Sequence, residues 1–273
     1  METARLILDP AADGAWNMSV DQALLETADS TGLISLRFYT WSEPTLSLGY
    51  FQSHHDRQLH EPSLDCQLVR RRTGGGAILH DNELTYSLCV PSENRWSEKN
   101  SELYRLVHRC IIELLDEVGI RSELFGDTKE SKNLEISAAE DSQQAAQKDV
   151  SNDTLTPTVD QKSFMCFNRR ADGDIVIQGH KVVGSAQRRI KKSLLQHGSI
   201  LLNRSNFAPT IKGISDLSEL NLQPDELAKL LAAKVFKCLC VQAFEGALKD
   251  PEVEAAKSAY SLQYNSEHWN QQR

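Results

Sequence analysis

The chain has 273 residues, of which 40% are hydrophobic, and a formal net charge of −8 at pH 7. Its length suits one large domain or two small ones. No stretch approaches the ~18 consecutive apolar residues of a membrane-spanning helix, and the N-terminus lacks the basic flank and apolar run of a secretory signal. We therefore predict a soluble, cytoplasmic protein that makes no contact with a membrane.

The negative charge is concentrated in one stretch. Residues 127–160 hold eight acids and three lysines, which is −5 of the net −8. The rest of the chain is nearly balanced, and its basic residues form runs at 70–72, 169–170, 188–189 and 191–192. A basic run is usually a solvated face. Because these runs flank the motifs described below, they favour an acidic partner; nucleic acid, which normally requires a basic domain, is not expected.

The cysteines do not have the spacing of a metal site. None belongs to a CxxC pair or to a Cys/His pattern typical of zinc, so no bound metal is predicted. In an intracellular protein they should be reduced, and most should be small buried hydrophobes. The six are Cys66, Cys89, Cys110, Cys166, Cys238 and Cys240.

The first third of the chain predicts a helix followed by strands. Residues 17–29 have apolar positions near helical spacing, with Asn17 or Ser19 as the expected N-cap. Residues 33–41 and 44–52 are rich in β-formers and are separated by Ser-Glu, which predicts a hairpin or a pair of neighbouring strands.

The next segments predict a strand, a glycine turn and a strand, and then a helix. Residues 66–91 read CQLVRRRTGGGAILHDNELTYSLCVP, in which apolar character resumes after the glycines and then alternates. Residues 100–120 place apolar residues at steps of three and four, which makes this the clearest amphipathic helix in the chain.

A polar stretch then interrupts the pattern. Residues 127–162 have no aromatic side chain and few apolar ones, so they offer little to offset the entropy of ordering. We interpret them as a flexible insertion within a single domain that spans residues 1–273. The alternative is a short helix over 137–148, which is less favoured because it has little apolar face.

Beyond the insertion, strands precede helices. Residues 174–179, 181–189 and 193–203 read as three strands, with turns at Gly179 and near 191–192. The later pattern is weakly helical at 214–217 and strongly helical at 225–248, and the last residues carry aromatic side chains where a frayed tail would be expected. Short strands with segregated helices and no regular βαβ alternation predict the α+β class.

Three consecutive glycines, residues 74–76, are the first candidate for a binding site. Without Cβ atoms, a ligand can lie directly against the main chain, although a tight bend or bulge is the structural alternative. One glycine would suffice for a turn, and the polar residues Arg71, Thr73, His80 and Asp81 bracket this stretch. The segment matches neither the Walker nor the Rossmann pattern. We therefore favour a binding site.

Cys166 and Lys181 each allow two interpretations. Cys166 stands at the first apolar point after the polar stretch, so it is either a core residue that begins a strand or a nucleophile delivered by a loop. Lys181 follows a turn glycine and precedes the small residues 184–186. It is either a solvent-facing charge or a cation that points into a cleft, where it could stabilise a carbonyl oxygen, a phosphate or a thiolate.

Three ordered motifs resemble the lipoate–protein ligase and octanoyltransferase family. They are RRRTGGGAILHD at 70–81, GHKVVGSAQR at 179–188 and QHGSILL at 196–202, and the blocks at 17–25 and 37–52 are similar too. The resemblance covers nearly the whole chain except the insertion. It implies the biotin/lipoate ligase catalytic fold, with a mixed or antiparallel sheet and packed helices. It also implies activity on lipoyl or octanoyl groups destined for a lysine of a lipoyl domain.

The resemblance also implies roles for particular residues. One wall of an acyl-group channel would be formed by Arg71, Thr73, Gly74, Gly75, Gly76 and His80. The opposing wall would be formed by Gly184, Ser185, Ala186, His197 and Gly198, and the family's motif lysine would be Lys181.

The family divides by chemistry at the position of Cys166. Its ligases activate a free acid with ATP and usually carry an Asn-Asp pair there. Its cysteine-dependent octanoyltransferases carry Cys-Phe fifteen residues before the motif lysine, as Cys166 and Lys181 do here. The chain departs from those transferases at 168–174, where NRRADGD replaces a Pro-Ser-aromatic segment, and in its long acidic insertion. These departures bear on the partner surface rather than on the nucleophile.

The resemblance therefore implies a catalytic pair, Cys166 and Lys181. An ammonium near a thiol favours the thiolate, which would take an octanoyl group from acyl carrier protein and pass it to a lysine. The acceptor would be a lipoyl-domain protein such as the glycine cleavage H protein or the acyltransferase subunit of a 2-oxoacid dehydrogenase. No cofactor is expected, because a thioester is already activated. The alternatives are a lipoate–protein ligase that uses ATP and Mg, and a non-catalytic binder of acyl groups or carrier protein.

Overall fold

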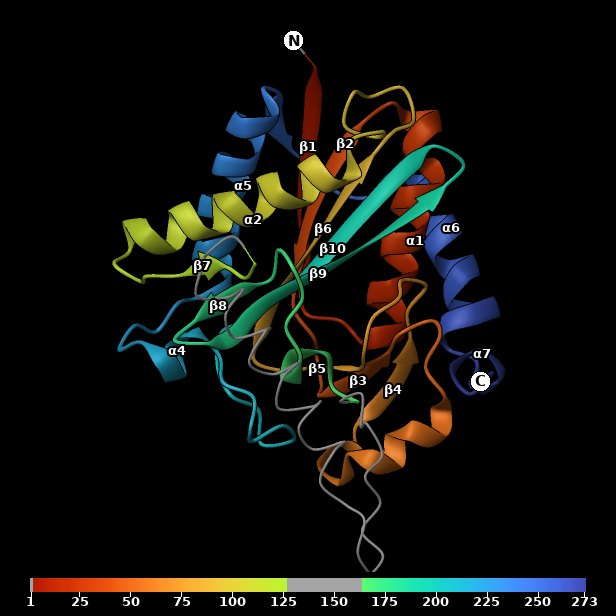
Figure 1. Ribbon diagram of the computed structural model, residues 1–273. Helices are drawn as coiled ribbons and strands as arrows, with labels where there is room; N and C mark the ends of the chain where they lie inside the picture. The colour runs from red at the N-terminus through yellow and green to blue at the C-terminus, as the bar shows by residue number, and fades with distance from the viewer. Residues whose placement is uncertain (1, 127–163) are drawn as a thin grey trace, which may run out of the picture.

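The computed structural model describes residues 2–126 and 164–273, and its centre is an eight-stranded mixed sheet (Figure 1). The strand order is β11-β1-β2-β6-β10-β9-β8-β7. Strand β1 pairs in parallel with both β2 and β11, and the remaining pairs are antiparallel. The strands are β1 (Thr3–Leu8), β2 (Ile34–Tyr39), β6 (Glu83–Val90), β7 (Glu123–Leu124), β8 (Ile175–Ile177), β9 (His180–Ile190), β10 (Ser193–Leu201) and β11 (Gln242–Glu245). Segments from both sides of residues 127–163 thus share one sheet.

A second sheet has three strands: β3 (Thr45–Leu48), β4 (Gln67–Arg70) and β5 (Ile78–His80). Strand β3 lies in the middle, parallel to β4 and antiparallel to β5. The predicted pairing of 33–41 with 44–52 is therefore wrong, because β2 and β3 belong to different sheets. Both edges of β2 are already occupied, by β1 and by β6, so no edge is left for β3.

Helices cover both faces of the large sheet (Figure 1). Helices α2 (Asn100–Glu117) and α5 (Pro224–Leu239) pack against one face in the largest apolar cluster. Helices α1 (Gly14–Thr31) and α6 (Asp250–Ala259) pack together on the other face. The remaining helical segments of the described residues are α4 (Ile214–Leu217), a π-helical turn (Tyr260–Tyr264), α7 (Glu267–Asn270) and three short 3-10 turns, His54–Leu59, Glu61–Ser63 and Cys166–Asn168. The expected α+β class with a mixed sheet is confirmed.

Helix α1 begins earlier than its spacing predicted. Its N-cap is Asp13, whose side chain accepts a hydrogen bond of 2.8 Å from the backbone N–H of Trp16. Asn17, one of the two expected caps, lies inside the helix and donates to the carbonyls of Ala12 and Thr40. These contacts occupy the side-chain amide of Asn17, although asparagine is a residue type favoured at N-caps.

The last helices also differ from the prediction. Helix α5 ends at Leu239, where Cys240 adopts a left-handed backbone (φ 59°), and the chain continues as β11 rather than as helix to residue 248. The free edge of β1 pairs with these residues, and that pairing overrides their helical pattern. The C-terminal segment is anchored, since Trp269 Nε1 donates to the carbonyl of Arg70 at 2.8 Å. The predicted insertion at 127–162 and its alternative helix lie outside the described residues.

Candidate active site

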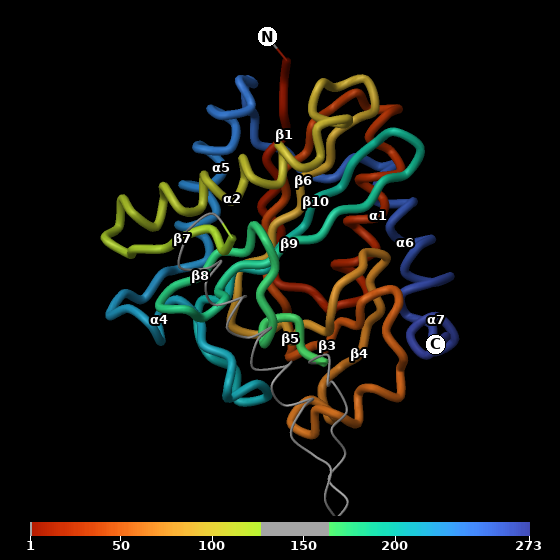
Figure 2. Tube along the Cα trace, viewed as in Figure 1, coloured from red at the N-terminus to blue at the C-terminus, as the bar shows by residue number. Residues whose placement is uncertain are grey.

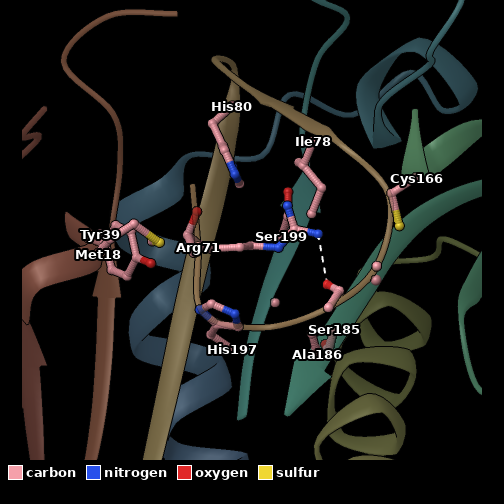
Figure 3. Close-up of a pocket in the computed structure, with 15 residues that line it drawn as sticks. Met18, Tyr39, Arg71, Ile78, His80, Cys166, Ser185, Ala186, His197 and Ser199 are labelled. Atoms are coloured by element: carbon pink, nitrogen blue, oxygen red, sulfur yellow. Dashed lines mark hydrogen bonds between the residues drawn. The ribbon is translucent and has the colours of Figure 1, made fainter. Parts of the chain in front are cut away.

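A cavity of about 470 Å³, open space at its mouth included, lies between the small sheet and strands β9 and β10 (Figure 3). The residues that line it are Met18, Tyr39, Arg71, Gly74, Gly75, Ile78, His80, Thr85, Cys166, Gly184, Ser185, Ala186, His197, Gly198 and Ser199.

The glycine loop between β4 and β5 is held by one guanidinium group. Arg71 donates to the carbonyls of Gly74 (3.0 Å), Gly76 (2.7 Å) and Ser47 (2.8 Å). Gly75 has a φ of 95°, a conformation that side chains other than glycine rarely adopt. Arg71 is buried and forms no ion pair with a carboxylate in residues 2–126 and 164–273. Burial lowers the pKa of Arg71 to about 10, so the group stays charged at neutral pH.

Main-chain hydrogen bonds place Cys166 against this loop. The N–H of Ala77 donates to the carbonyl of Phe164 (2.9 Å), and the N–H of Cys166 donates to the carbonyl of Ala77 (2.7 Å). Figure 2 shows the segment that leads into β8 running beside β5. A Cβ at Gly76 would lie only 3.1 Å from the Cα of Cys166, so glycine is required for this approach. Cys166 begins a short 3-10 turn, Cys166–Asn168, rather than a strand, and its thiol is half-buried at the cavity.

Lys181 points inward toward the thiol. Its Nζ lies 3.5 Å from Cys166 Sγ and 2.8 Å from Asp174 Oδ2, and the side chain is only 5% exposed. The interpretation of Lys181 as a solvent-facing charge is therefore wrong. Burial raises the pKa of Asp174, and the neighbouring Lys181 ammonium limits that rise. A Cβ at Gly184 would come within 2.5 Å of Lys181 Cε, so this glycine makes room for the lysine.

His197 is fixed in one orientation by two buried partners. Its Nδ1 lies 3.2 Å from Asp21 Oδ2, and its Nε2 lies 2.8 Å from Thr73 Oγ1. Burial opposes ionisation of Asp21, but the hydrogen bond from His197 and the charge of Arg37 bring the pKa of Asp21 below its usual value. Because a carboxylate can only accept, Nδ1 carries a proton.

His80 is held equally firmly. Its Nδ1 lies 2.6 Å from Glu83 Oε1, its Nε2 lies 2.8 Å from Ser47 Oγ, and its ring stacks on Trp41 with centroids 3.9 Å apart. Both cavity histidines thus keep their positions before any ligand binds.

The opposing wall consists of two paired strands. Ser185 on β9 faces Gly198 on β10, and Ala186 faces His197. A Cβ at Gly198 would overlap Ser185 Oγ and the ring of Tyr86, so a glycine is needed there.

Most of the predicted site residues meet around this cavity. Thr73, Gly76 and Lys181 do not line it but lie directly behind residues that do: Thr73 holds His197, Gly76 abuts Cys166, and Lys181 contacts its sulfur. Sequence reasoning missed the lining residues Met18, Tyr39, Ile78, Thr85 and Ser199.

Two buried titratable groups, Asp174 and His108, were also missed. The available signals were an acid at the first position of a predicted strand and a histidine on the apolar face of a predicted helix. Either is more often a satisfied core group than a functional one.

Within 2–126 and 164–273, no group of three or more His, Cys, Asp or Glu side chains is arranged to hold a metal ion. None of the helices in those two ranges is long and apolar enough to cross a bilayer.

The site places a thiol beside a buried ammonium, at a cavity walled by glycine backbone. Such an arrangement can carry a transferred group on sulfur. Residues 13–229 match the lipoyl protein ligase A/B catalytic domain, and the chain belongs to that family. The family expected from the three motifs is thereby confirmed.

Two relatives that align with almost the whole chain are named as octanoyltransferases. Octanoyltransferase LipM of Halalkalibacterium halodurans is 32% identical over 99% of each chain. Octanoyltransferase LipM of Clostridioides difficile is 30% identical over 100% of each chain.

Solved structures support the fold. A putative lipoate protein ligase from T. acidophilum with bound lipoic acid superposes with a TM-score of 0.72 at 20% identity, covering 99% of this chain and 100% of that chain. A lipoate-protein ligase A bound with ATP gives 0.71 at 20% identity, with 99% of each chain covered. At this identity the likeness concerns the fold alone.

Proposed function

We propose that this protein is an octanoyltransferase of lipoate biosynthesis that carries the octanoyl group on Cys166. The full-length similarity to octanoyltransferases supports the overall activity. The observation that carries the covalent route is the 3.5 Å separation between Lys181 Nζ and Cys166 Sγ at a glycine-lined cavity.

Two buried cations and one carboxylate lie near the sulfur of Cys166. Lys181 shares its charge with Asp174, which lies closer to it than the sulfur does. Arg71 adds a second buried cation with no carboxylate partner in the described residues. With a thiolate, these four groups are electrically balanced; with a thiol, one positive charge is left over. An unbalanced buried charge is unfavourable.

In the first half-reaction, the Cys166 thiolate attacks the carbonyl carbon of the octanoyl thioester. A bond forms to Sγ, the bond to the donor sulfur breaks, and the departing thiolate takes a proton from Lys181. This is an exchange between two thioesters of similar energy, so the acyl-enzyme is accessible without further activation.

In the second half-reaction, the amine of the acceptor lysine attacks the acyl-enzyme. The C–N bond forms, the bond to Sγ breaks, and the now neutral Lys181 takes one amine proton, which restores the starting pair. An amide is more stable than a thioester, so this step drives the transfer forward.

We further propose the donor and the acceptor. The donor is octanoyl-acyl carrier protein and the acceptor is a lipoyl-domain protein, such as the glycine cleavage H protein or the acyltransferase subunit of a 2-oxoacid dehydrogenase. Two arginines near Tyr50 suit an acidic partner. The guanidinium groups of Arg188 and Arg273 lie 5.7 Å and 4.8 Å from the ring centre of Tyr50. The thioester needs neither ATP nor another cofactor. The unpaired cysteines suit the cytoplasm.

Intact-protein mass spectrometry tests this proposal directly. Incubation with octanoyl-acyl carrier protein and no ATP should add one octanoyl group to the wild type and none to Cys166→Ala. Amide product formed only from a free acid plus ATP would make the protein a ligase and sink the covalent route. Octanoyl ligands that bind without turnover under either condition would indicate a non-catalytic binder.

A further inference from the structure

The hydroxyl of Ser185, which lines the cavity, belongs to a buried chain of hydrogen bonds. His108, a fully buried residue of α2, lies behind it. The Nε2 of His108 is 2.6 Å from Ser185 Oγ, and its Nδ1 is 2.5 Å from the carbonyl oxygen of Gly173. Tyr86 contacts the same serine from β6, with its hydroxyl 2.7 Å from Ser185 Oγ.

The direction of every bond in this chain follows from chemistry. A carbonyl oxygen can only accept, so the Nδ1 of His108 carries a proton. Burial and the nearby Lys181 charge lower the pKa of His108 to about 4, so at neutral pH the ring has no second proton. Nε2 must therefore accept, and the single proton of the Ser185 hydroxyl is committed to it.

The other end of the chain is equally determined. Because the Ser185 proton points to His108, the Tyr86 hydroxyl donates to Ser185. The Tyr86 oxygen in turn accepts from Gln196 Nε2 at 2.9 Å. A hydroxyl oxygen has two lone pairs and one is now used, so Ser185 presents the cavity with a lone pair and no proton. It cannot stabilise an oxyanion, which requires donors.

We propose that Ser185 binds an N–H of the incoming acceptor amine during the second half-reaction. This inference rests on the proposed function, in which the amine loses one proton to Lys181. The other N–H, which remains in the amide product, is held by Ser185 Oγ, and this aims the nitrogen lone pair at the acyl carbon. Of the reacting groups that the two substrates bring, the thioester and the amine, only the amine has N–H donors. His108 acts through Ser185 as a positioning residue.

Measuring the two half-reactions separately tests the assignment. In Ser185→Ala, acylation of Cys166 by octanoyl-acyl carrier protein should keep its rate within about twofold. Transfer from the isolated acyl-enzyme to a lipoyl domain should slow about tenfold or more, the equivalent of one lost hydrogen bond. Slower acylation with normal transfer would instead assign Ser185 to an amide of the donor. Equal slowing of both steps would mean that Ser185 only shapes the cavity. Either result overturns the proposal.

Two variants that each remove one partner of the same hydroxyl sharpen the test. His108→Phe frees the Ser185 proton to rotate into the cavity, so transfer should slow about as much as in Ser185→Ala. Tyr86→Phe leaves the Ser185 proton donated to His108, so transfer should change by less than about threefold.

Acylation of Cys166 at a normal rate shows in each case that the variant is folded. Equal slowing of transfer in both variants would contradict the proposed polarity. A wild type that never acylates would refute the proposed function itself.

Discussion

At the scale of single residues, the site is governed by how buried charges share partners. Lys181 lies between a carboxylate and a sulfur, and Asp174 holds the nearer position, at 2.8 Å against 3.5 Å. The carboxylate keeps the lysine in place and also offsets much of its charge. Arg71, whose hydrogen bonds within residues 2–126 and 164–273 all go to backbone and hydroxyl oxygens, supplies the remaining positive field.

Opposite substitutions in this pair should change the reactivity of Cys166 in opposite directions. Lys181→Met removes the adjacent cation, so alkylation by iodoacetamide at pH 7 should slow about tenfold and not vanish, because Arg71 remains. Asp174→Asn removes the competing anion, so alkylation should proceed at the wild-type rate or faster. Both variants disrupt the same ion pair. If alkylation slowed equally in both, packing rather than charge would control the thiol.

At the scale of elements, features that depend on the local sequence pattern were predicted, and features that depend on long-range strand pairing were not. The apolar spacing of α2 and the glycine turn after β4 are local features and were predicted. Strand β3 belongs to the second sheet, and α5 ends at Leu239. Both features depend on which strand edges are free, which is a property of the assembled molecule. The motif spacing likewise indicated Cys166 and Lys181. Asp174 and His108 act through partners distant in sequence, and no short motif marks them.

Gly198 on β10 leaves room for the side chains of Ser185 on β9 and Tyr86 on β6. Gly198→Ala should place a methyl group against Ser185 Oγ and Tyr86 and lower the free energy of unfolding by about 1–3 kcal/mol, as overpacking does. Gly74→Ala is a matched control in the same cavity, since its Cβ would meet only the Phe51 ring at 3.9 Å. Urea unfolding measures both. Equal stability of the two variants would show that the strands can separate without cost.

At the scale of the whole molecule, burying His108 in its neutral form makes stability depend on pH. Its pKa is about 4 in the folded protein, against 6.5 as the ordinary value for the unfolded chain. Between these values the unfolded chain binds the extra proton, so this contribution is present above pH 6.5 and declines as the pH falls toward 4.

From pH 7 to pH 5, this single group should lower the free energy of unfolding by about 2 kcal/mol. Urea titrations at the two pH values should show this loss in the wild type, and His108→Phe should show correspondingly less. An identical difference in both proteins would mean that His108 is charged, or reaches solvent, in the folded state.

The main-chain bonds that join Ala77 to Phe164 and Cys166 have an evolutionary consequence. Backbone amides are the same whatever side chains they carry, so, apart from the glycine at position 76, the position of the sulfur depends little on the identity of its neighbours. Descendants of this scaffold can therefore exchange the surrounding side chains, and with them the cargo and the docking proteins, while the nucleophile stays aligned. Such a linkage suits a lineage in which related enzymes diversify around one preserved geometry.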